Sequence, residues 1–313
     1  MTEMMKAVRY HEYGGPEALV VEQVPKPEPG PGQVLVRIHA ASVNPVDWRL
    51  REGEMKAFIQ IQFPATVGRD LAGVIEAVSE DVHGLRPGDE VFAVMPREAF
   101  GAYAEYAVLD QSAVALKPKT LDFVQAAAFP MSALTAWQGV VETGGIKAGD
   151  SLFVHAAAGS VGGIAVQIGR ALGVHVTAAA SAEARSLVEG YGAERFVDYK
   201  AERFEETVRD QDVVFDTLAG EMQTRSWGML KPNGIMVSTL GIVDPDKAKE
   251  FGVRATSIVC TPNAEQLGRL AEMIDAGKIR PNVGAVLTLD DAAKAQELNR
   301  TGTVKGKIVL TVP

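Results

Sequence analysis

SLFVHAAAGSVGGIAVQIGRALG, residues 151–173, joins a short apolar run to a turn of alanine and glycine and then to a segment with helical apolar spacing. This order of strand, turn and helix predicts a pyrophosphate site, because small side chains let the backbone approach the anion and free N–H groups point at it. The turn, Ala157-x-Gly159-x-x-Gly162, is a variant of the G-x-G-x-x-G pattern with alanine in first place. An ordinary tight connection between a strand and a helix is the alternative.

Strands and helices continue to alternate downstream of this turn. Alternation of this kind predicts an α/β fold with a parallel, doubly wound sheet and right-handed crossovers. The predicted strands, with helical patterns between them, are residues 152–155, 174–179, 195–198, 212–216 and 235–239.

The first third of the chain differs, because its short strand-like runs are broken by glycine and proline, as in a compact, partly open barrel or sandwich. The composition changes near Thr120, and β character returns in the tail. The two ends are therefore expected to pack together as one domain, residues 1–124 with 262–313, around a nucleotide-binding domain of residues 125–261. A junction beside the carboxyl ends of parallel strands is where such a fold places its ligand.

The composition of the whole chain narrows its class. The 313 residues, 47% hydrophobic and 23% charged, are those of an ordinary globular protein, and the net charge of −9 argues against nucleic acid. Cys260 is the one cysteine in the sequence, so no internal disulfide forms. The chain shows no apolar run long enough to cross a bilayer and no signal-peptide core. These features predict a cytoplasmic protein without a membrane partner.

The residues after the second predicted strand indicate which dinucleotide binds. Sites that prefer NAD carry an acidic residue there, about 20 positions after the glycines. Here residues 177–185 read TAAASAEAR, with no acid at the strand end. Ser181 can donate to a 2′-phosphate and Arg185 can pair with it, whereas Glu183 suits solvent at the first helical turn. NADP(H) is therefore the predicted cofactor; a plain helix cap at Ser181 and a solvated Arg185 are the alternatives.

Nine motifs spread over nearly the whole chain carry a resemblance to a known family. They are MKAVRYHEYGGPEAL (5–19), SVNPVDWRLREG (42–53), FPATVGRDLAGVIEAV (63–78), LRPGDEVFAV (85–94), FGAYAEYAVL (100–109), HAAAGSVG (155–162), FDTLAG (215–220), LKPNG (230–234) and GKIVLTV (306–312). Together they resemble the medium-chain dehydrogenase/reductase superfamily, in its quinone oxidoreductase-like branch. The resemblance implies a GroES-like N-terminal catalytic domain, a Rossmann domain, and a C-terminus that returns to the first domain.

This sequence lacks the residues that bind zinc in the zinc-containing members of that superfamily. Those members place a cysteine ligand in the segment matching residues 42–47 and a His-Glu pair after the glycine matching Gly68. This chain has no cysteine there and reads Gly68-Arg69-Asp70, and its five histidines have no ligand spacing. A structural zinc lobe of four cysteines is likewise absent from the sequence. We therefore predict no metal.

The predicted reaction follows from that departure, because oxidation of an alcohol needs zinc or a strong base to remove a proton. NADPH is instead expected to give hydride to an electrophilic acceptor such as a quinone or an α,β-unsaturated carbonyl, and zinc-free family members are similar enzymes. An enoyl-thioester reductase and a non-catalytic NADPH-binding sensor are the alternatives. The expected partners are a small-molecule substrate and, from the family, a second copy in a homodimer.

The resemblance also implies residues near the acceptor. Asn44 matches a position beside the nicotinamide and the substrate carbonyl, where an amide can donate to a developing oxyanion; a simple turn residue before Pro45 is the alternative. Asp47 is expected to orient Asn44 or a water, or else to cap a helix. Trp48 is expected to wall the pocket or lie in the core, and Arg69 to pair with Asp70 in the substrate region. The proton donor is Tyr103, Tyr106 or water.

Further residues are expected to contact the cofactor. Thr135 matches a position at the nicotinamide or ribose, and Leu240 and Gly241 follow the fifth strand, where the family's backbone meets the nicotinamide. Tyr199 is expected near the 2′-phosphate beside Arg185. The other expected contacts are Gly159, Ser160, Val161 and Gly162 at the pyrophosphate and Lys305 across the cleft.

Overall fold

The computed structural model describes residues 2–97 and 99–313, and the chain forms two compact units. We call the first the β-rich unit; it comprises Met1–Met131, Thr261–Asp275 and Pro281–Pro313. The second, the parallel-sheet unit, comprises Ser132–Cys260 and Ala276–Arg280. The first crossing between the units thus lies slightly beyond the predicted limit at residue 124, and the sequence did not indicate that the short segment 276–280 packs in the second unit.

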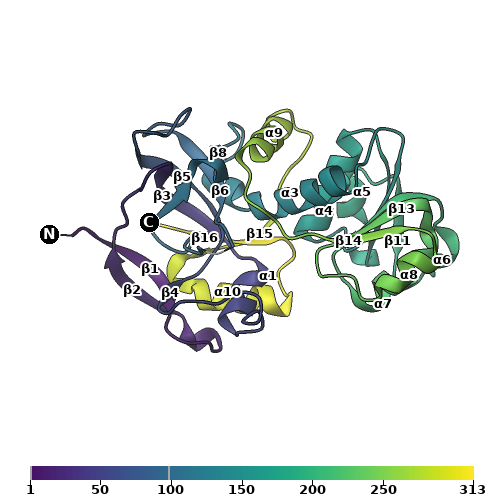
Figure 1. Cartoon of the computed structure of the whole chain (residues 1–313), viewed down its shortest axis with the longest axis horizontal. Helices are drawn as coiled ribbons and strands as arrows, with labels where there is room; N and C mark the ends of the chain where they lie inside the picture. The colour runs from purple at the N-terminus through teal and green to yellow at the C-terminus, as the bar shows by residue number, and fades with distance from the viewer. Residues whose placement is uncertain (1, 98) are drawn as a thin grey trace. The chain divides into compact units, whose positions relative to one another are not determined.

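The β-rich unit contains two sheets, a small one in the order β2-β1-β4 and a larger one in the order β15-β16-β3-β5-β6-β8, with β7 paired to β3. The strands are β1 (Met4–Tyr10), β2 (Val20–Pro25), β3 (Gln33–Ser42), β4 (Ala65–Thr66), β5 (Asp70–Val78), β6 (Glu90–Val94), β7 (Tyr106–Asp110), β8 (Val114–Leu116), β15 (Val283–Thr288) and β16 (Lys307–Thr311). The C-terminal strand β16 runs antiparallel to β3, with Val309 opposite Ser42 (Figure 1). The tail therefore returns to the N-terminal domain, as the resemblance implied, and pairs within its larger sheet.

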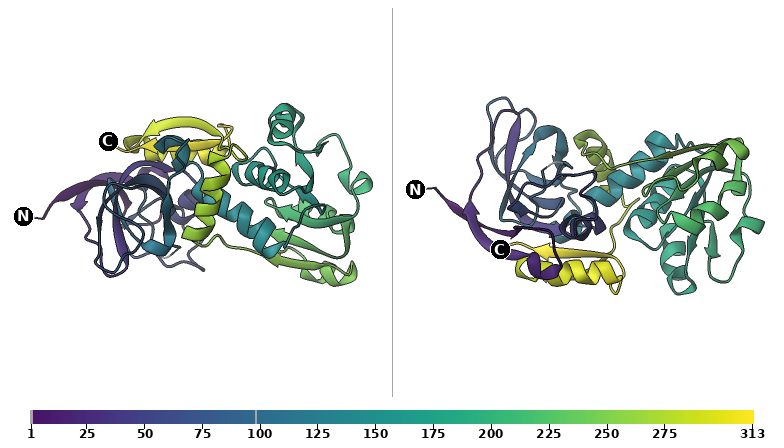
Figure 2. Two further views of the ribbon diagram at one scale, coloured as in Figure 1. Left: turned by 90° about the horizontal axis from the view of Figure 1, so that it is seen from above. Right: turned by 60° about the horizontal axis from the view of Figure 1, so that its bottom comes forward.

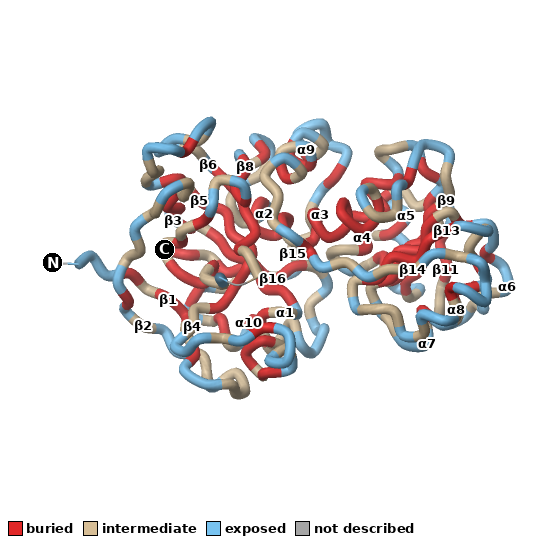
Figure 3. Tube along the Cα trace, viewed as in Figure 1, coloured by how far each residue is buried: buried red, intermediate tan, exposed pale blue. Residues whose placement is uncertain are grey.

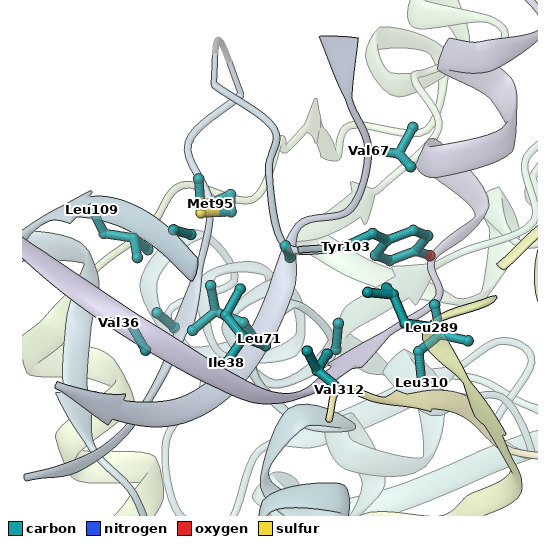
Figure 4. Packing of buried hydrophobic residues seen from close by; sticks show 14 of the residues in the cluster. Val36, Ile38, Val67, Leu71, Met95, Tyr103, Leu109, Leu289, Leu310 and Val312 are labelled. Carbon is teal, nitrogen blue, oxygen red and sulfur yellow. The ribbon is translucent and has the colours of Figure 1, made fainter. Parts of the chain in front are cut away.

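Four α-helices accompany these sheets in the described part of the β-rich unit. They are α1 (Pro45–Arg51), α2 (Phe123–Ala127), α9 (Ala264–Asp275) and α10 (Ala292–Thr301). Apolar periodicity over residues 121–128 and 264–276 of the sequence predicts helices that match α2 and α9. It does not predict α1 or α10, because α1 is short and α10 is mostly polar. Tyr103, one of the candidate proton donors, precedes β7 and packs in the core with Leu71 and Leu310 (Figure 4).

The parallel-sheet unit confirms the alternation that the sequence predicted. Its strands, ordered β11-β10-β9-β12-β13-β14, are β9 (Ser151–Val154), β10 (His175–Ala180), β11 (Arg195–Asp198), β12 (Gln211–Asp216), β13 (Leu230–Ser238) and β14 (Arg254–Ser257). Its helices are α3 (Pro130–Trp137), which continues as a π-helical turn (Gln138–Thr143), α4 (Ser160–Ala171), α5 (Arg185–Tyr191), α6 (Phe204–Thr207), α7 (Gly220–Arg225) and α8 (Pro245–Glu250). All neighbouring strands run parallel, and the connections that lead from β9 and from β12 in opposite directions place helices on both faces (Figure 2).

The order of the strands positions a ligand site in this unit. The chain winds outward from β9 in one direction and from β12 in the other, so the strand order reverses between these two strands. Both are buried except for Ser151 and Asp212, which are partly exposed, and Figure 3 shows the buried residues of β9 in red. Ligands of open parallel sheets bind at the carboxyl ends of the strands beside such a reversal.

None of the described helices has the length and apolar character that a membrane span requires.

Candidate active site

Asn44 marks the start of α1 in the β-rich unit. Pro45 occupies the first helical position, where its missing N–H costs no hydrogen bond. The backbone N–H of Asn44 donates to Oδ2 of Asp47 at 2.8 Å, which is one half of a capping box. Asp47 therefore caps the helix, and through the same bond it holds the backbone of Asn44.

The Asn44 side chain belongs to a buried polar cluster that we define as Ser42, Asn44, Asp70 and Lys307. Lys307 Nζ donates to Asn44 Oδ1 at 2.7 Å, to Asp70 Oδ2 at 3.1 Å and to the Val43 carbonyl at 3.2 Å. Asn44 Nδ2 and Ser42 Oγ each donate to Asp70 Oδ2 at 2.9 Å. Because an ammonium only donates and a carboxylate only accepts, the orientation of the amide follows from its partners.

This cluster qualifies the role predicted for Asn44. Its Nδ2 also reaches the Ser42 carbonyl at 3.4 Å, so both amide hydrogens have acceptors within the protein. Donation to a developing oxyanion requires one of these bonds to open. The 3.4 Å contact is the weaker of the two and is the one that an acceptor would replace.

Arg69 and Asp70 do not pair, which corrects the expectation from the sequence. Arg69 is buried and donates from Nε and Nη2 to the Met95 carbonyl, at 3.0 and 2.9 Å. Asp70 Oδ1 instead accepts from the backbone N–H of Met131 at 2.8 Å, and its Oδ2 belongs to the polar cluster. Residues adjacent along an extended backbone direct their side chains to opposite faces, so these two neighbours are separated.

Lys307 belongs to this cluster with Asn44, and the sequence reasoning did not single it out. The cofactor contact expected of Lys305 stays a prediction. Lys305 is exposed, whereas Lys307 is buried and its ammonium is fully bonded. One signal was present in the sequence: a lysine that opens the strand KIVLT and precedes three apolar residues. A charged residue there must find a partner, because an unpaired buried ammonium is very costly.

Asp47 connects the helix start to a second buried group. Tyr103 Oη donates to Asp47 Oδ2 at 2.9 Å, and no described residue hydrogen-bonds to Asp47 Oδ1. Gly68 makes this approach possible: its φ is +94°, and a Cβ there would lie 2.2 Å from the Tyr103 ring. Burial raises the pKa of Asp47 to about 7, against the opposing hydrogen bonds from Asn44 N–H and Tyr103.

Asp47→Asn tests this raised pKa. Between the ordinary pKa of 3.8 and the folded value of about 7, the native state binds more protons than the unfolded chain, so its free energy of unfolding falls as the pH rises. The asparagine cannot ionise, and its Oδ1 can still accept from Asn44 N–H and Tyr103. We expect urea denaturation at about pH 5 and pH 8 to show a smaller loss of stability in the variant than in the parent. The exposed Asp246→Asn is the control; an equal loss in Asp47→Asn and the parent would contradict the assignment.

Trp48 lies on the side of α1 that packs against α10. Its Nε1 donates to Asn299 Oδ1 at 3.1 Å, and Arg51 Nε donates to Gln296 Oε1 at 2.8 Å. These bonds account for the position of the Trp48 ring. Its predicted place in the pocket wall stays a prediction.

The glycine turn of the parallel-sheet unit has the features of an anion site. Gly159 caps α4 without a side-chain hydrogen bond, so the N–H groups at the start of this 12-residue helix are not capped by a side chain. Gly162 is required by a close approach, because a Cβ there would lie 2.4 Å from the carbonyl oxygen of Ala156. These features fit the diphosphate of a dinucleotide.

The residues predicted to read the 2′-phosphate follow two neighbouring strands. Ser181 directly follows β10 and caps the next helical turn. The backbone N–H of Tyr199, after β11, donates to the carbonyl of Ala180 at 3.4 Å. Arg185 opens α5; its guanidinium carbon lies 4.3 Å from the centroid of the Phe196 ring, and its Nη1 lies 3.3 Å from Glu189 Oε1. The structure therefore brings Ser181 and Tyr199 to one edge, with Arg185 one helical turn further along the chain.

Three further residues that were predicted to contact the cofactor also belong to this unit. Thr135 is buried on α3, and Leu240 and Gly241 follow β13 in a loop where Gly241 has a φ of +96°. Among residues 2–97 and 99–313, no group of three or more His, Cys, Asp or Glu side chains lies close enough together to hold a metal ion.

Comparison with known proteins places this fold in a family. An alcohol dehydrogenase GroES-like domain profile matches residues 30–119, and a zinc-binding dehydrogenase profile matches residues 191–310. The chain is 35% identical to 2-methylene-furan-3-one reductase from Solanum lycopersicum, over 98% of this chain and 79% of that protein. Identity and coverage are the same for the chloroplastic NADPH-dependent alkenal/one oxidoreductase of Arabidopsis thaliana, at 35%, 98% and 79%.

Solved structures agree with these matches. The quinone oxidoreductase from Coxiella burnetii has a TM-score of 0.89 to this chain at 30% identity, covering 99% of this chain and 100% of that one. The GroES-like domain and the Rossmann domain are thus both confirmed. With relatives that match almost its whole length, this chain belongs to the medium-chain dehydrogenase/reductase superfamily.

Proposed function

We propose that this protein is an NADPH-dependent oxidoreductase that reduces quinones or α,β-unsaturated carbonyl compounds. The observation that carries the proposal is the turn at residues 156–162, where a required glycine and an uncapped helix start fit a dinucleotide diphosphate. The substrate class is supported by relatives whose names are alkenal/one oxidoreductase and quinone oxidoreductase.

The residues of the β-rich unit suit the acceptor half of this reaction. Bound NADPH supplies a hydride; the acceptor gains it at its electrophilic carbon, the displaced electron pair moves to the carbonyl oxygen, and a proton completes the two-electron reduction. Asn44 is the proposed donor to that oxygen, while Lys307 and Asp70 hold its amide in one orientation. Asp47 and Tyr103 hold the backbone at the start of α1.

The choice of NADP(H) over NAD(H) is part of the proposal, supported by Ser181 and Arg185 and by the absence of an acidic residue at the end of β10. We also propose that the chain is a homodimer in the cytoplasm and that residues 125–261 form the cofactor domain. Light scattering coupled to gel filtration tests the dimer.

A panel of acceptors tests the proposed reaction. NADPH absorbance is followed with a 1,4-quinone, a 2-alkenal, an enoyl thioester and a saturated aldehyde, each at the same concentration. We expect oxidation of NADPH with the quinone or the 2-alkenal and none with the saturated aldehyde, which lacks the conjugated electrophilic carbon. Turnover with the thioester alone would indicate an enoyl-thioester reductase. Tight NADPH binding without any turnover would indicate a sensor.

A further inference from the structure

Three buried polar side chains hold the loop that follows β13, residues 238–243. We call Asp216, Gln223 and Ser238 the loop clamp; each is fully buried. Gln223 Nε2 donates to the Gly241 carbonyl at 2.9 Å, and its Oε1 accepts from the Val243 N–H at 2.8 Å. One side chain therefore grips the loop at two points of its backbone.

The other two members of the clamp support this grip. Gln223 Nε2 also donates to Asp216 Oδ2 at 2.8 Å, and Ser238 Oγ donates to the same oxygen at 2.7 Å. Ser238 Oγ in turn accepts from the Leu240 N–H at 3.1 Å. Both polar atoms of the Gln223 side chain, Nε2 and Oε1, are therefore hydrogen-bonded within one network. Fully bonded buried networks of this kind rigidify the backbone to which they bond.

The same carboxylate orders the loop after the neighbouring strand β12. Asp216 Oδ1 accepts from the backbone N–H groups of Leu218 and Ala219, at 3.0 and 3.1 Å. Ala219 has a φ of +56°, a left-handed conformation that a residue other than glycine keeps only where its surroundings enforce it. The clamp therefore fixes two adjacent loops at the carboxyl edge of the sheet, where ligands of this fold bind.

The held loops expose apolar side chains instead of burying them. Leu218, Leu240 and Val243 are 43%, 49% and 56% exposed, and a Cβ at Gly241 would meet no atom within 4 Å. A loop with little packing of its own is ordinarily mobile. Here a buried network stabilises an exposed apolar surface, which is the arrangement expected of a preorganised binding surface.

We infer that the loop clamp presets residues 238–243 to receive the nicotinamide half of the dinucleotide, which makes Asp216, Gln223 and Ser238 positioning residues. This inference rests on the proposed function and on the expectation from the sequence that Leu240 and Gly241 contact the cofactor. The inference assigns different residues to the two ends of the dinucleotide. The adenosine 2′-phosphate is expected to bind Ser181, Arg185 and Tyr199, while the loop clamp acts only at the nicotinamide end.

Gln223→Met tests the inference, because methionine keeps the length of the side chain and removes its three hydrogen bonds, to Asp216, Gly241 and Val243. We expect the Kd for NADPH to rise and kcat to fall by about 10- to 100-fold, since a small displacement of the nicotinamide is enough for such a loss. The Kd for 2′,5′-ADP, which carries the 2′-phosphate but no nicotinamide, should change less than about twofold. Thr224→Val, which removes a hydroxyl bonded within α7, is the matched control.

Ser238→Ala is the second variant, for the case in which Gln223→Met does not fold. It removes one bond to Asp216 and the acceptor of Leu240 N–H, and it should show the same split between NADPH and 2′,5′-ADP. Equal losses for both ligands, or no loss for either, would overturn the inference. These binding measurements need no acceptor, so a parent protein that fails to bind NADPH would refute the proposed function rather than the clamp.

Discussion

Lys307→Met is expected to lower the free energy of unfolding by about 3–5 kcal/mol, the cost of leaving a buried charge without its partner. The side chains of Lys307 and Asp70 are only 5% and 0% exposed, and their atoms lie 3.1 Å apart. Asp70 would keep its bonds from Asn44, Ser42 and the Met131 N–H but would lose its only cationic neighbour in the polar cluster. Urea denaturation at neutral pH measures the difference.

The matched control is Lys6→Met, because Lys6 and Asp290 are also 3.1 Å apart but with 28% and 61% of their side chains exposed. An exposed pair contributes about 0–1 kcal/mol, so this variant should be nearly as stable as the parent. Lys307→Met combined with Asp70→Leu removes both charges and should regain part of the lost stability. If Lys307→Met costs no more than Lys6→Met, the cluster does not hold a buried ion pair of the proposed importance.

Arg185→Ala is expected to raise the KM for NADPH by roughly 10- to 100-fold and to leave the KM for NADH nearly unchanged, since a hydrogen bond to a charged group contributes about 1.5–3 kcal/mol. The guanidinium is positioned for this role by the face of the Phe196 ring, and its carboxylate partner Glu189 is half exposed. Initial rates with each cofactor at a fixed acceptor concentration give both constants.

Arg195→Ala controls for the loss of one positive charge. Arg195 lies at the amino end of β11, away from the carboxyl edge, and donates to the Thr207 carbonyl and hydroxyl. It should leave the ratio of the two KM values unchanged. Equal effects of Arg185→Ala on NADPH and NADH would refute the assignment of Arg185 to the 2′-phosphate.

Local pattern was sufficient to predict much of this fold. The five strands predicted between residues 152 and 239 are β9–β13, because apolar runs, helical spacing and glycine turns are properties of neighbouring residues. The same holds for the turn at Ala157–Gly162, because the spacing of its glycines between a strand and a helix can be recognised in the sequence itself. Short or polar helices such as α1 and α10 carry too little periodicity to be seen, although α1 holds Asn44 and Asp47.

The candidate site was predicted only in part, for a physical reason that Arg69 and Lys307 illustrate. Sequence adjacency suggested that Arg69 pairs with Asp70, but the extended backbone turns the two side chains to opposite faces. The cation that Asp70 does bind is 237 positions away, on β16. Nothing in the residues around Asp70 specifies that partner.

By itself, then, the sequence determined the α/β class, the dinucleotide turn and the family, since each depends on residue types at short spacing. The tertiary structure alone decided which charges meet: Lys307 and Asn44 are 263 positions apart, and the pairing of β16 with β3 brings them into contact. The tertiary structure also decided that Gln223 hydrogen-bonds to the backbone of the loop after β13. Burial explains both, because a polar group removed from water must find its partner in three dimensions, wherever that partner lies in the chain.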